Sequence, residues 1–218
     1  MKWTTALAWL FALLACVPCQ AARTGAEPLI DPQDRPWHPQ PPAIEQPLWP
    51  ETLAITLPAT TGAERFGRSP GTIAGQPVTM VQLVSRPSMT IYRPSVANTG
   101  AAIVVFPGGG YRVLAIDLEG TEVCDWLVGQ GITCVLLKYR VPGSGPYWAD
   151  ECNCRRIPEV PMALQQAGIP AELHLYPRGG HAFGLRVANT PLANWPSLAR
   201  TWLDEMGVLA DSATAPAE

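Results

Sequence analysis

The chain has 218 residues, which is the length of one domain and too short for two full ones. Its 47% hydrophobic and 15% charged residues are enough to build a core, so wholesale disorder is excluded. The net charge of −3 excludes a basic surface for nucleic acid.

Residues 1–22 are typical of a secretory signal peptide. Residues 3–17 are nearly all apolar, and Ala21-Ala22 offers a small-residue cleavage point. The apolar run is shorter than the roughly 20 residues that span a bilayer, so no transmembrane segment is expected. A secreted or periplasmic protein is therefore predicted. Two alternatives stay open: a bacterial lipoprotein lipidated at Cys16, and a retained anchor.

Residues 23–75 form a proline-rich leader ahead of the domain. The chain has 24 prolines, and nine of them lie between Pro28 and Pro58. Proline fixes φ and lacks an amide donor, so this stretch cannot be a regular helix or a central strand. We expect an extended leader that crosses the surface of a domain at 76–207, followed by a flexible tail at 208–218. A proline-rich ligand segment is the alternative.

Four cysteines follow the signal peptide, and they allow three disulfide pairings between which the sequence does not choose: Cys124, Cys134, Cys152 and Cys154. The pair Cys152-Asn153-Cys154 lacks zinc-site spacing and a second ligand pair, so no metal is expected. A disulfide from this pair to the region of Cys124 and Cys134 is an open alternative in an oxidising compartment. A second open alternative is a metal site built from Cys152, Cys154 and His181.

The predicted elements of the domain begin with strands at 78–84 and 88–93. The continuous apolar run 101–106 predicts a strand buried on both faces. A glycine-rich turn, a helix at 117–129 and a second buried strand at 133–139 follow. This order is one βαβ unit, which predicts a parallel sheet and an α/β class. The later elements expected are a short helix at 159–168, a strand at 171–176 and an amphipathic helix at 192–206.

Pro107-Gly108-Gly109-Gly110-Tyr111 joins the first buried strand to the helix. Three glycines allow the backbone to approach a ligand closely and to direct amide N–H groups at it. Such a loop suits an oxyanion or a phosphate, and a structural turn is the alternative. The lysine of a phosphate loop and the G-x-G-x-x-G of a dinucleotide site are both missing, so no cofactor is expected.

His181 follows the predicted strand 171–176 in a glycine-rich loop. The carboxyl end of a strand is where α/β folds place functional residues, so His181 is the candidate catalytic histidine. His174 lies within that strand and His38 within the leader. We expect structural or solvent-exposed roles for both.

These features together resemble the α/β-hydrolase superfamily. Residues 107–142, which begin P-G-G-G-Y-R and end L-L-K-Y-R-V-P, are similar to secreted esterases of the acetyl-xylan esterase and dienelactone-hydrolase-like group. Residues 167–185, A-G-I-P-A-E-L-H-L-Y-P-R-G-G-H-A-F-G-L, resemble the C-terminal part of the same group. The two segments occur in the order of the family.

The resemblance implies roles for four residues. Gly109 and Gly110 would supply the oxyanion-hole amides, and His181 would be the general base of a serine esterase. Tyr111 would lie in the substrate cleft. Substrates would be small acyl esters, above all acetylated polysaccharide. The implied fold is a partial α/β-hydrolase fold: a mostly parallel sheet flanked by helices, a three-layer sandwich with central strands missing.

The nucleophile elbow of the family, G-x-S-x-G after a buried strand, is missing from its place. Between 141 and 171 the chain has one serine, Ser144, in a loop-like context. The acids there are Asp150, Glu151 and Glu159, and none has the expected setting. Gly67-Arg68-Ser69-Pro70-Gly71 matches the motif, but no buried strand leads into it. We expect a surface turn there and an inactive chain.

An in-frame deletion around 164–166 would explain this gap, because it would remove both the elbow and the acid. It would also leave strand 101–106 with an unpaired edge of apolar residues. Strand 171–176 could fill the vacancy. Otherwise the exposed sheet edge favours self-association.

A non-catalytic carbohydrate-binding or interaction protein is the alternative function. Its feature would be exposed aromatic side chains near the expected cleft or in the leader: Tyr111, Tyr147, Trp148, Trp37 and Trp49.

Overall fold

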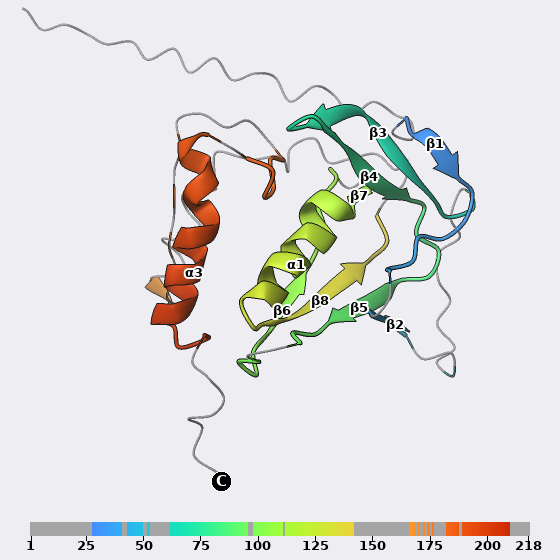
Figure 1. Ribbon diagram of the computed structural model, residues 1–218. Helices are drawn as coiled ribbons and strands as arrows, with labels where there is room; N and C mark the ends of the chain where they lie inside the picture. The colour runs from blue at the N-terminus through green and yellow to red at the C-terminus, as the bar shows by residue number, and fades with distance from the viewer. Residues whose placement is uncertain are drawn as a thin grey trace, which may run out of the picture.

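The computed structural model describes most of the leader and domain, and its two ends fall outside the described part. The described residues are 28–40, 43–49, 52, 62–95, 98–110, 112–141, 166–168, 170, 172, 174, 176, 182–187 and 189–209. These residues include eight strands and the helices α1 and α3, which Figure 1 labels. The strands are β1 (Ile30–Gln33), β2 (Ile44–Pro47), β3 (Arg65–Ile73), β4 (Gln76–Gln82), β5 (Ser88–Tyr92), β6 (Ala102–Val105), β7 (Leu114–Ala115) and β8 (Thr133–Lys138). The helical elements are the π-helical turn η1 (Asp117–Thr121), α1 (Glu122–Gly129), the 3₁₀ turn η4 (Pro191–Asn194) and α3 (Trp195–Glu205).

The strands form two four-stranded sheets. Sheet A has the order β1-β3-β4-β7, and sheet B has the order β2-β5-β8-β6. Of the six strand pairings among the described residues, five are antiparallel, and β6 with β8 is the parallel one. The expected fold class, a partial α/β-hydrolase fold with a mostly parallel sheet in a three-layer sandwich, is therefore wrong.

The reason lies in the connections between strands. A parallel pair needs a crossover, and α1 provides one between β6 and β8. β3 and β4 are instead joined by the two-residue turn Ala74-Gly75, in which both residues have positive φ. That turn conformation suits an antiparallel hairpin. The βαβ unit predicted from the sequence is thus present, but it is a local unit within an antiparallel setting.

The leader contributes strands to both sheets. β1 pairs with β3 at one edge of sheet A, and β2 pairs with β5 at one edge of sheet B. Edge positions tolerate proline, which β1 and β2 both contain. β3 also lies within the 23–75 range and shares sheet A with β4 of the 76–207 range. The domain boundaries themselves remain a prediction.

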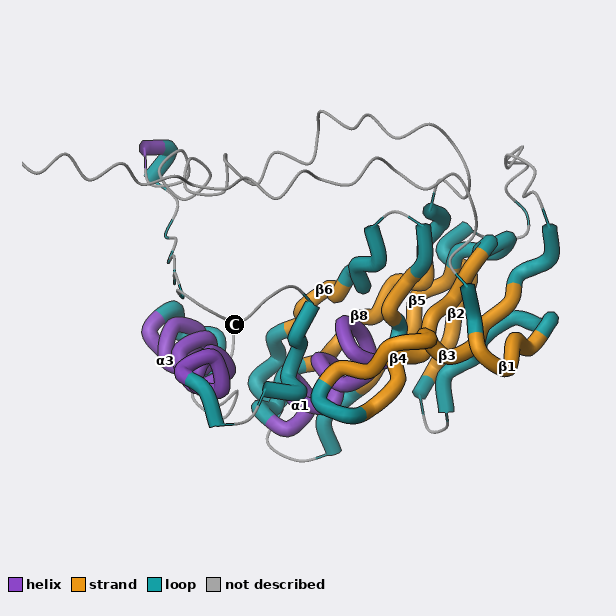
Figure 2. The backbone as a smooth tube through the Cα atoms, turned by 90° about the horizontal axis from the view of Figure 1, so that it is seen from above, coloured by secondary structure: helices purple, strands orange, loops and turns teal. Residues whose placement is uncertain are grey.

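The main core lies between α1, β4 and the face of sheet B that is turned toward α1, which we call the inner face. Its central members are Val81, Leu114, Leu127 and Leu136, all with almost no exposed surface. Figure 2 shows α1 and sheet A on the same side of sheet B. α3 adds Leu203 to this core.

β6 differs from its expected environment. A strand buried on both faces was predicted, but β6 is the edge of sheet B, and Val104 is 50% exposed. A continuous apolar run does not distinguish a central strand from an edge strand. Of the strand predicted at 171–176, the described residues Glu172, His174 and Tyr176 belong to no strand, and the others lie outside the described part. The helix expected at 192–206 is confirmed by η4 and α3.

One disulfide joins α1 to β8. Cys124 and Cys134 are bonded to each other, with their Cα atoms 5.2 Å apart. Neither cysteine can therefore bond to Cys152 or Cys154, so the alternative of a disulfide from Cys152 or Cys154 to this region is wrong. Cys152 and Cys154 lie outside the described residues. The disulfide is consistent with an extracellular location. Within the described part of the chain, no helix is long and apolar enough to cross a membrane.

A buried ionic cluster ties the leader to β8. Lys138 Nζ lies 3.0 Å from Glu64 Oε1 and 3.4 Å from Glu45 Oε1, and it donates a hydrogen bond of 2.9 Å to the carbonyl of Trp37. Burial raises the pKa of Glu45, but hydrogen bonds with His38 and Ser88 and the nearby charge of Lys138 together outweigh burial, so that pKa lies below its ordinary value. Two leader segments are thus held on β8, one of the two inner strands of sheet B.

We expect the Cys124→Ala/Cys134→Ala double variant to lose about 3 kcal/mol of unfolding free energy. The disulfide closes a loop with a sequence separation of 10, and opening it restores conformational entropy to the unfolded chain. Urea unfolding followed by circular dichroism measures the change. Reduced wild-type protein is the control and should match the variant. Equal midpoints for oxidised and reduced wild-type protein would contradict the expectation.

Candidate functional site

The glycine loop follows β6 and has a backbone that needs glycine. Gly109 has φ of +145° and Gly110 has φ of +58°. The carbonyl of Gly109 accepts hydrogen bonds from the amides of Arg112 and Val113, at 3.1 and 3.2 Å. A Cβ atom on Gly109 would overlap the backbone carbonyl of Val113. The close turn therefore depends on the missing side chain.

Three hydrogen bonds fix the loop to its surroundings. The Tyr139 hydroxyl donates to the carbonyl of Pro107 at 2.7 Å. The amide of Gly108 donates to Glu119 Oε2 at 2.9 Å, and the carbonyl of Gly108 accepts from the amide of Ala115 at 2.8 Å. The loop is thereby attached to the residue after β8, to η1 and to β7. A loop held at three points keeps its remaining amides in fixed directions.

The amides of Gly109 and Gly110 differ from that of Gly108. Neither donates a hydrogen bond to any residue in the described part of the chain. Gly110 is exposed and Gly109 is partly exposed, so solvent and ligand reach them. Their role stays a prediction, and Tyr111 lies outside the described residues.

His181 also lies outside the described residues, but the segment that follows it is described. Ala182 packs against the cluster of Val78, Ala115 and Leu118. Gly184, with φ of +55°, lies so close to Leu118 that a Cβ atom would overlap it. The indole of Trp195 donates to the carbonyl of Gly184 at 3.0 Å. The segment 182–187 is therefore docked on η1 and hydrogen-bonded to Trp195, the first residue of α3.

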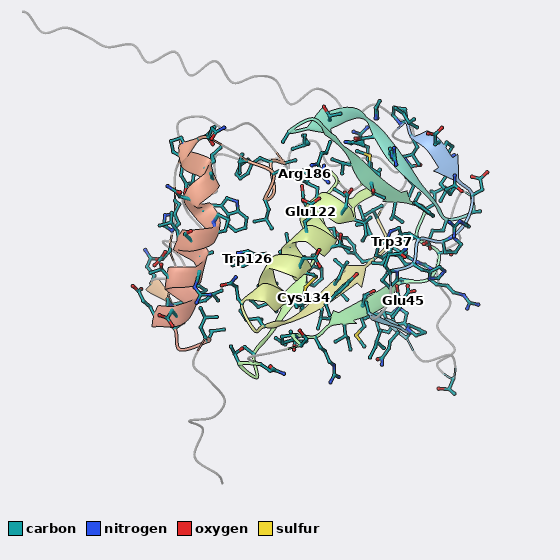
Figure 3. All side chains as sticks on the ribbon, in the orientation of Figure 1. Trp37, Glu45, Glu122, Trp126, Cys134 and Arg186 are labelled. Carbon is teal, nitrogen blue, oxygen red and sulfur yellow. A yellow bond between two sulfur atoms is a disulfide. The ribbon has the colours of Figure 1, made fainter. Side chains whose placement is uncertain are left out.

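Arg186 is the main polar anchor of this segment. Its Nη2 lies 2.6 Å from Glu122 Oε1 and 3.3 Å from Asp117 Oδ2. Figure 3 labels Arg186 and Glu122, whose side chains lie next to each other. Its Nη1 donates to the carbonyls of Gln76 and Pro77. The hydrogen bonds with Glu122 raise the pKa of Arg186 above its ordinary value. Sequence reasoning missed this cluster, because no local pattern pairs an arginine with acids more than sixty residues away.

η1 brings the two predicted site segments together. Glu119 binds the amide of Gly108, and the neighbouring Leu118 packs against Gly184. The loop 107–110 and the segment 182–187 thus contact consecutive residues of one helical turn. A joint site for Gly109, Gly110 and His181 stays a prediction.

Ser69 is not a surface-turn residue, so that expectation is wrong. It lies within β3 and is buried. Its hydroxyl donates to the carbonyl of Gly71 at 2.5 Å and accepts from the amide of Val78 at 3.0 Å. A buried hydroxyl with both roles occupied is a structural group and not a nucleophile. The other residues weighed for that part of the mechanism lie outside the described residues: Ser144, Asp150, Glu151 and Glu159.

The other histidines lie in surface positions. Nδ1 of His38 is 2.6 Å from Glu45 Oε2, and Nε2 of His174 is 3.0 Å from Glu172 Oε2. Among the aromatic residues of the leader, Trp49 is exposed, and Trp37 packs against the core. Tyr147 and Trp148 lie outside the described residues. No group of three or more metal-ligating side chains occurs among the described residues, which exclude Cys152, Cys154 and His181.

We expect Gly109→Ala to cost about 2–4 kcal/mol of unfolding free energy, because the new Cβ overlaps a backbone carbonyl and the backbone conformation disfavours alanine. Gly129→Ala is the matched control, since open space surrounds Gly129 at the end of α1. It should be neutral or stabilising by up to about 1 kcal/mol. Chemical denaturation measures both. Equal stabilities of the two variants would show that the loop is not packed as described.

A short stretch of the chain is similar to a known enzyme. Over 44 residues it is 48% identical to an acetylxylan esterase from Xylanibacter ruminicola. The stretch is 20% of this chain and 9% of that protein, so the match spans less than a tenth of the relative's length. No protein-family model and no solved structure matches the chain. The comparisons therefore show a partial, short-range resemblance to an acetylxylan esterase.

Proposed function

We propose that the chain carries the acyl-oxygen-binding part of a carboxylic ester hydrolase site without the means to form an acyl-enzyme. The observation that carries the proposal is the pair of amides of Gly109 and Gly110, which donate to no described residue, in a loop fixed at three points. Two neighbouring amide donors favour an oxygen that bears negative charge, such as that of a polarised ester carbonyl. The similarity to an acetylxylan esterase supports an acyl ester as the ligand.

The proposed ligand is a small acyl ester or an acetylated polysaccharide. His181 would lie beside the carbonyl oxygen, since the segment after it docks on the helical turn that also holds Gly108. In an active enzyme, a histidine in this position takes a proton from serine. The sequence offers no G-x-S-x-G after a buried strand, and Ser69 is engaged within β3. We attribute the missing nucleophile and acid to an internal deletion around 164–166.

The test is incubation of the purified chain with a fluorophosphonate probe, which labels activated serines. We expect no labelling above that of heat-denatured chain, because the sequence has no G-x-S-x-G after a buried strand and the hydroxyl of Ser69 is engaged within β3. An active serine esterase in the same reaction is the positive control. Stoichiometric labelling would overturn the proposal, and the variants Ser69→Ala and Ser144→Ala would then identify the nucleophile.

A second candidate function is non-catalytic binding of acetylated polysaccharide. The observation that favours it is Phe106, which is 63% exposed and directly precedes the glycine loop. Its ring lies edge-on to that of Tyr139, with the centroids 6.0 Å apart. An exposed, fixed aromatic ring beside polar donors is a suitable platform for a sugar ring.

Affinity electrophoresis in gels with acetylated xylan tests this second function. We expect the wild-type chain to be retarded and Phe106→Ala to lose most of the retardation, because the stacking surface is removed. Ile30→Ala is the matched control, since Ile30 is also an exposed apolar residue but lies on sheet A. Equal mobility of the wild-type chain with and without polysaccharide would contradict the binding function.

A further inference from the structure

The leader segment 37–49 is held on sheet B with little apolar contact. None of its described residues is buried, and its strand β2 lies at an edge of sheet B, where it pairs with β5. Trp37 packs against the main core, but Ile44 of β2 is 48% exposed. A segment that buries so little apolar surface can separate locally from a fold, so its polar contacts decide whether it stays attached.

Glu45 is the one residue of β2 that is not exposed. In the strand register it lies beside Thr90 of β5, which lies beside Leu136 of β8, and both of these residues are buried. Partners in register point to the same face of a sheet, so β2 directs a carboxylate toward the inner face, where a strand ordinarily places an apolar side chain. The contact of β2 with the inner face therefore depends on the groups that neutralise this carboxylate.

Three side chains from three parts of the chain hold the carboxylate of Glu45. Its Oε1 lies 3.4 Å from Lys138 Nζ and accepts a hydrogen bond of 2.7 Å from the hydroxyl of Ser88. Its Oε2 lies 2.6 Å from Nδ1 of His38. The ammonium of Lys138 also donates to the carbonyl of Trp37 at 2.9 Å, so one cation holds the segment 37–49 at two points. Figure 3 labels Trp37 and Glu45 close together beside sheet B.

Further charged or titratable groups lie around these contacts: Glu64 just before β3, Tyr92 of β5, Asp125 of α1 and Arg140 just after β8. Glu64 Oε1 lies 3.0 Å from Lys138 Nζ, and Glu64 Oε2 accepts from the amide of Ser85, whose carbonyl accepts from Arg140. Burial, and then the charges of Asp125 and Glu45, raise the pKa of Tyr92 to about 12, so its hydroxyl is uncharged in acid. None of these groups belongs to the segment 37–49, whose own titratable side chains are His38 and Glu45.

Acid acts on these contacts through Glu45. Burial raises the pKa of Glu45, but His38, Ser88 and Lys138 together hold it below its ordinary value of 4.5 in the folded chain. A carboxyl group whose pKa is lower in the attached state stabilises the attachment above pH 4.5, and this stabilisation is lost as the pH falls through the lower value. Once Glu45 is neutral, the protonated imidazole of His38 and the ammonium of Lys138 face each other across an uncharged group and repel each other.

We infer that acid releases the segment 37–49 from sheet B through protonation of Glu45, while the rest of the fold stays in place. The main core is apolar, and the disulfide of Cys124 with Cys134 joins α1 to β8, so neither depends on Glu45. Lys138 keeps its contact with Glu64, so its buried charge is still paired after the release. Release uncovers the edge of β5 with which β2 pairs.

Hydrogen exchange of the purified chain from about pH 7 to pH 3, followed by mass spectrometry and corrected for the intrinsic effect of pH, tests the inference. Peptides that cover 43–49 should lose protection at least about tenfold in acid, whereas peptides of α1 and β8 keep theirs. Glu45→Gln keeps an acceptor oxygen without the charge, so its 43–49 peptides should be less protected at pH 7 and respond little to acid. His38→Ala removes a hydrogen bond that lowers the pKa of Glu45, so release should begin at higher pH.

Glu172→Gln is the matched control, because Glu172 also pairs with a histidine, His174 at 3.0 Å, but contacts no residue of the segment 37–49. It should release the segment at the same pH as the wild-type chain. Unchanged protection of 43–49 down to pH 3 would overturn the inference, as would simultaneous loss of protection in 43–49, α1 and β8. A Glu172→Gln effect as large as that of Glu45→Gln would overturn it too. No ester or polysaccharide is present, so none of these results bears on the proposed function.

Discussion

The parallel pairing of β6 with β8 is the constraint on which the rest of the structure depends. Two parallel neighbours need a crossover between them, and the chain uses the loop 107–110, η1 and α1 for it. The crossover covers the inner face of sheet B and places the glycine loop at the carboxyl end of β6. The disulfide then joins α1 to β8. The crossover between β6 and β8 thus contributes both to the core and to the candidate site.

Local patterns predicted the elements around this unit well. The strands expected at 78–84, 88–93, 101–106 and 133–139 correspond to β4, β5, β6 and β8, and the helix at 117–129 corresponds to η1 and α1. Strand pairing was not predictable in the same way. Hydrophobic periodicity describes the two faces of a strand but not its neighbours. The antiparallel partners of β4 and β5 include β3 and β2, which come from a stretch whose prolines favoured an extended leader.

At the candidate site, too, local sequence patterns predicted the type of turn, whereas contacts between residues far apart in the chain could not be predicted. Three successive glycines indicated a turn that needs glycine, and the positive φ angles of Gly109 and Gly110 confirm that turn, whereas the approach to a ligand stays a prediction. The partners that fix the loop and the neighbouring segment could not be read from spacing. Arg186 reaches acids on η1 and α1 and carbonyls in β4, and these contacts exist only once the chain has folded. Ser69 was expected in a surface turn, but it is buried in β3, where its hydroxyl bonds to Gly71 and Val78.

The buried cluster around Lys138 has a consequence for the order of folding. Lys138 binds the carbonyl of Trp37, 101 residues earlier in the chain, and the carboxylate of Glu64, 74 residues earlier. A chain made from its N-terminus presents both carboxylates of the cluster long before their ammonium partner exists. Glu45 and Glu64 stay hydrated during that time, because burial of an unpaired charge is costly. Closure of so long a loop is slow, so β2 is expected to join sheet B late, after β5 and β8 have paired.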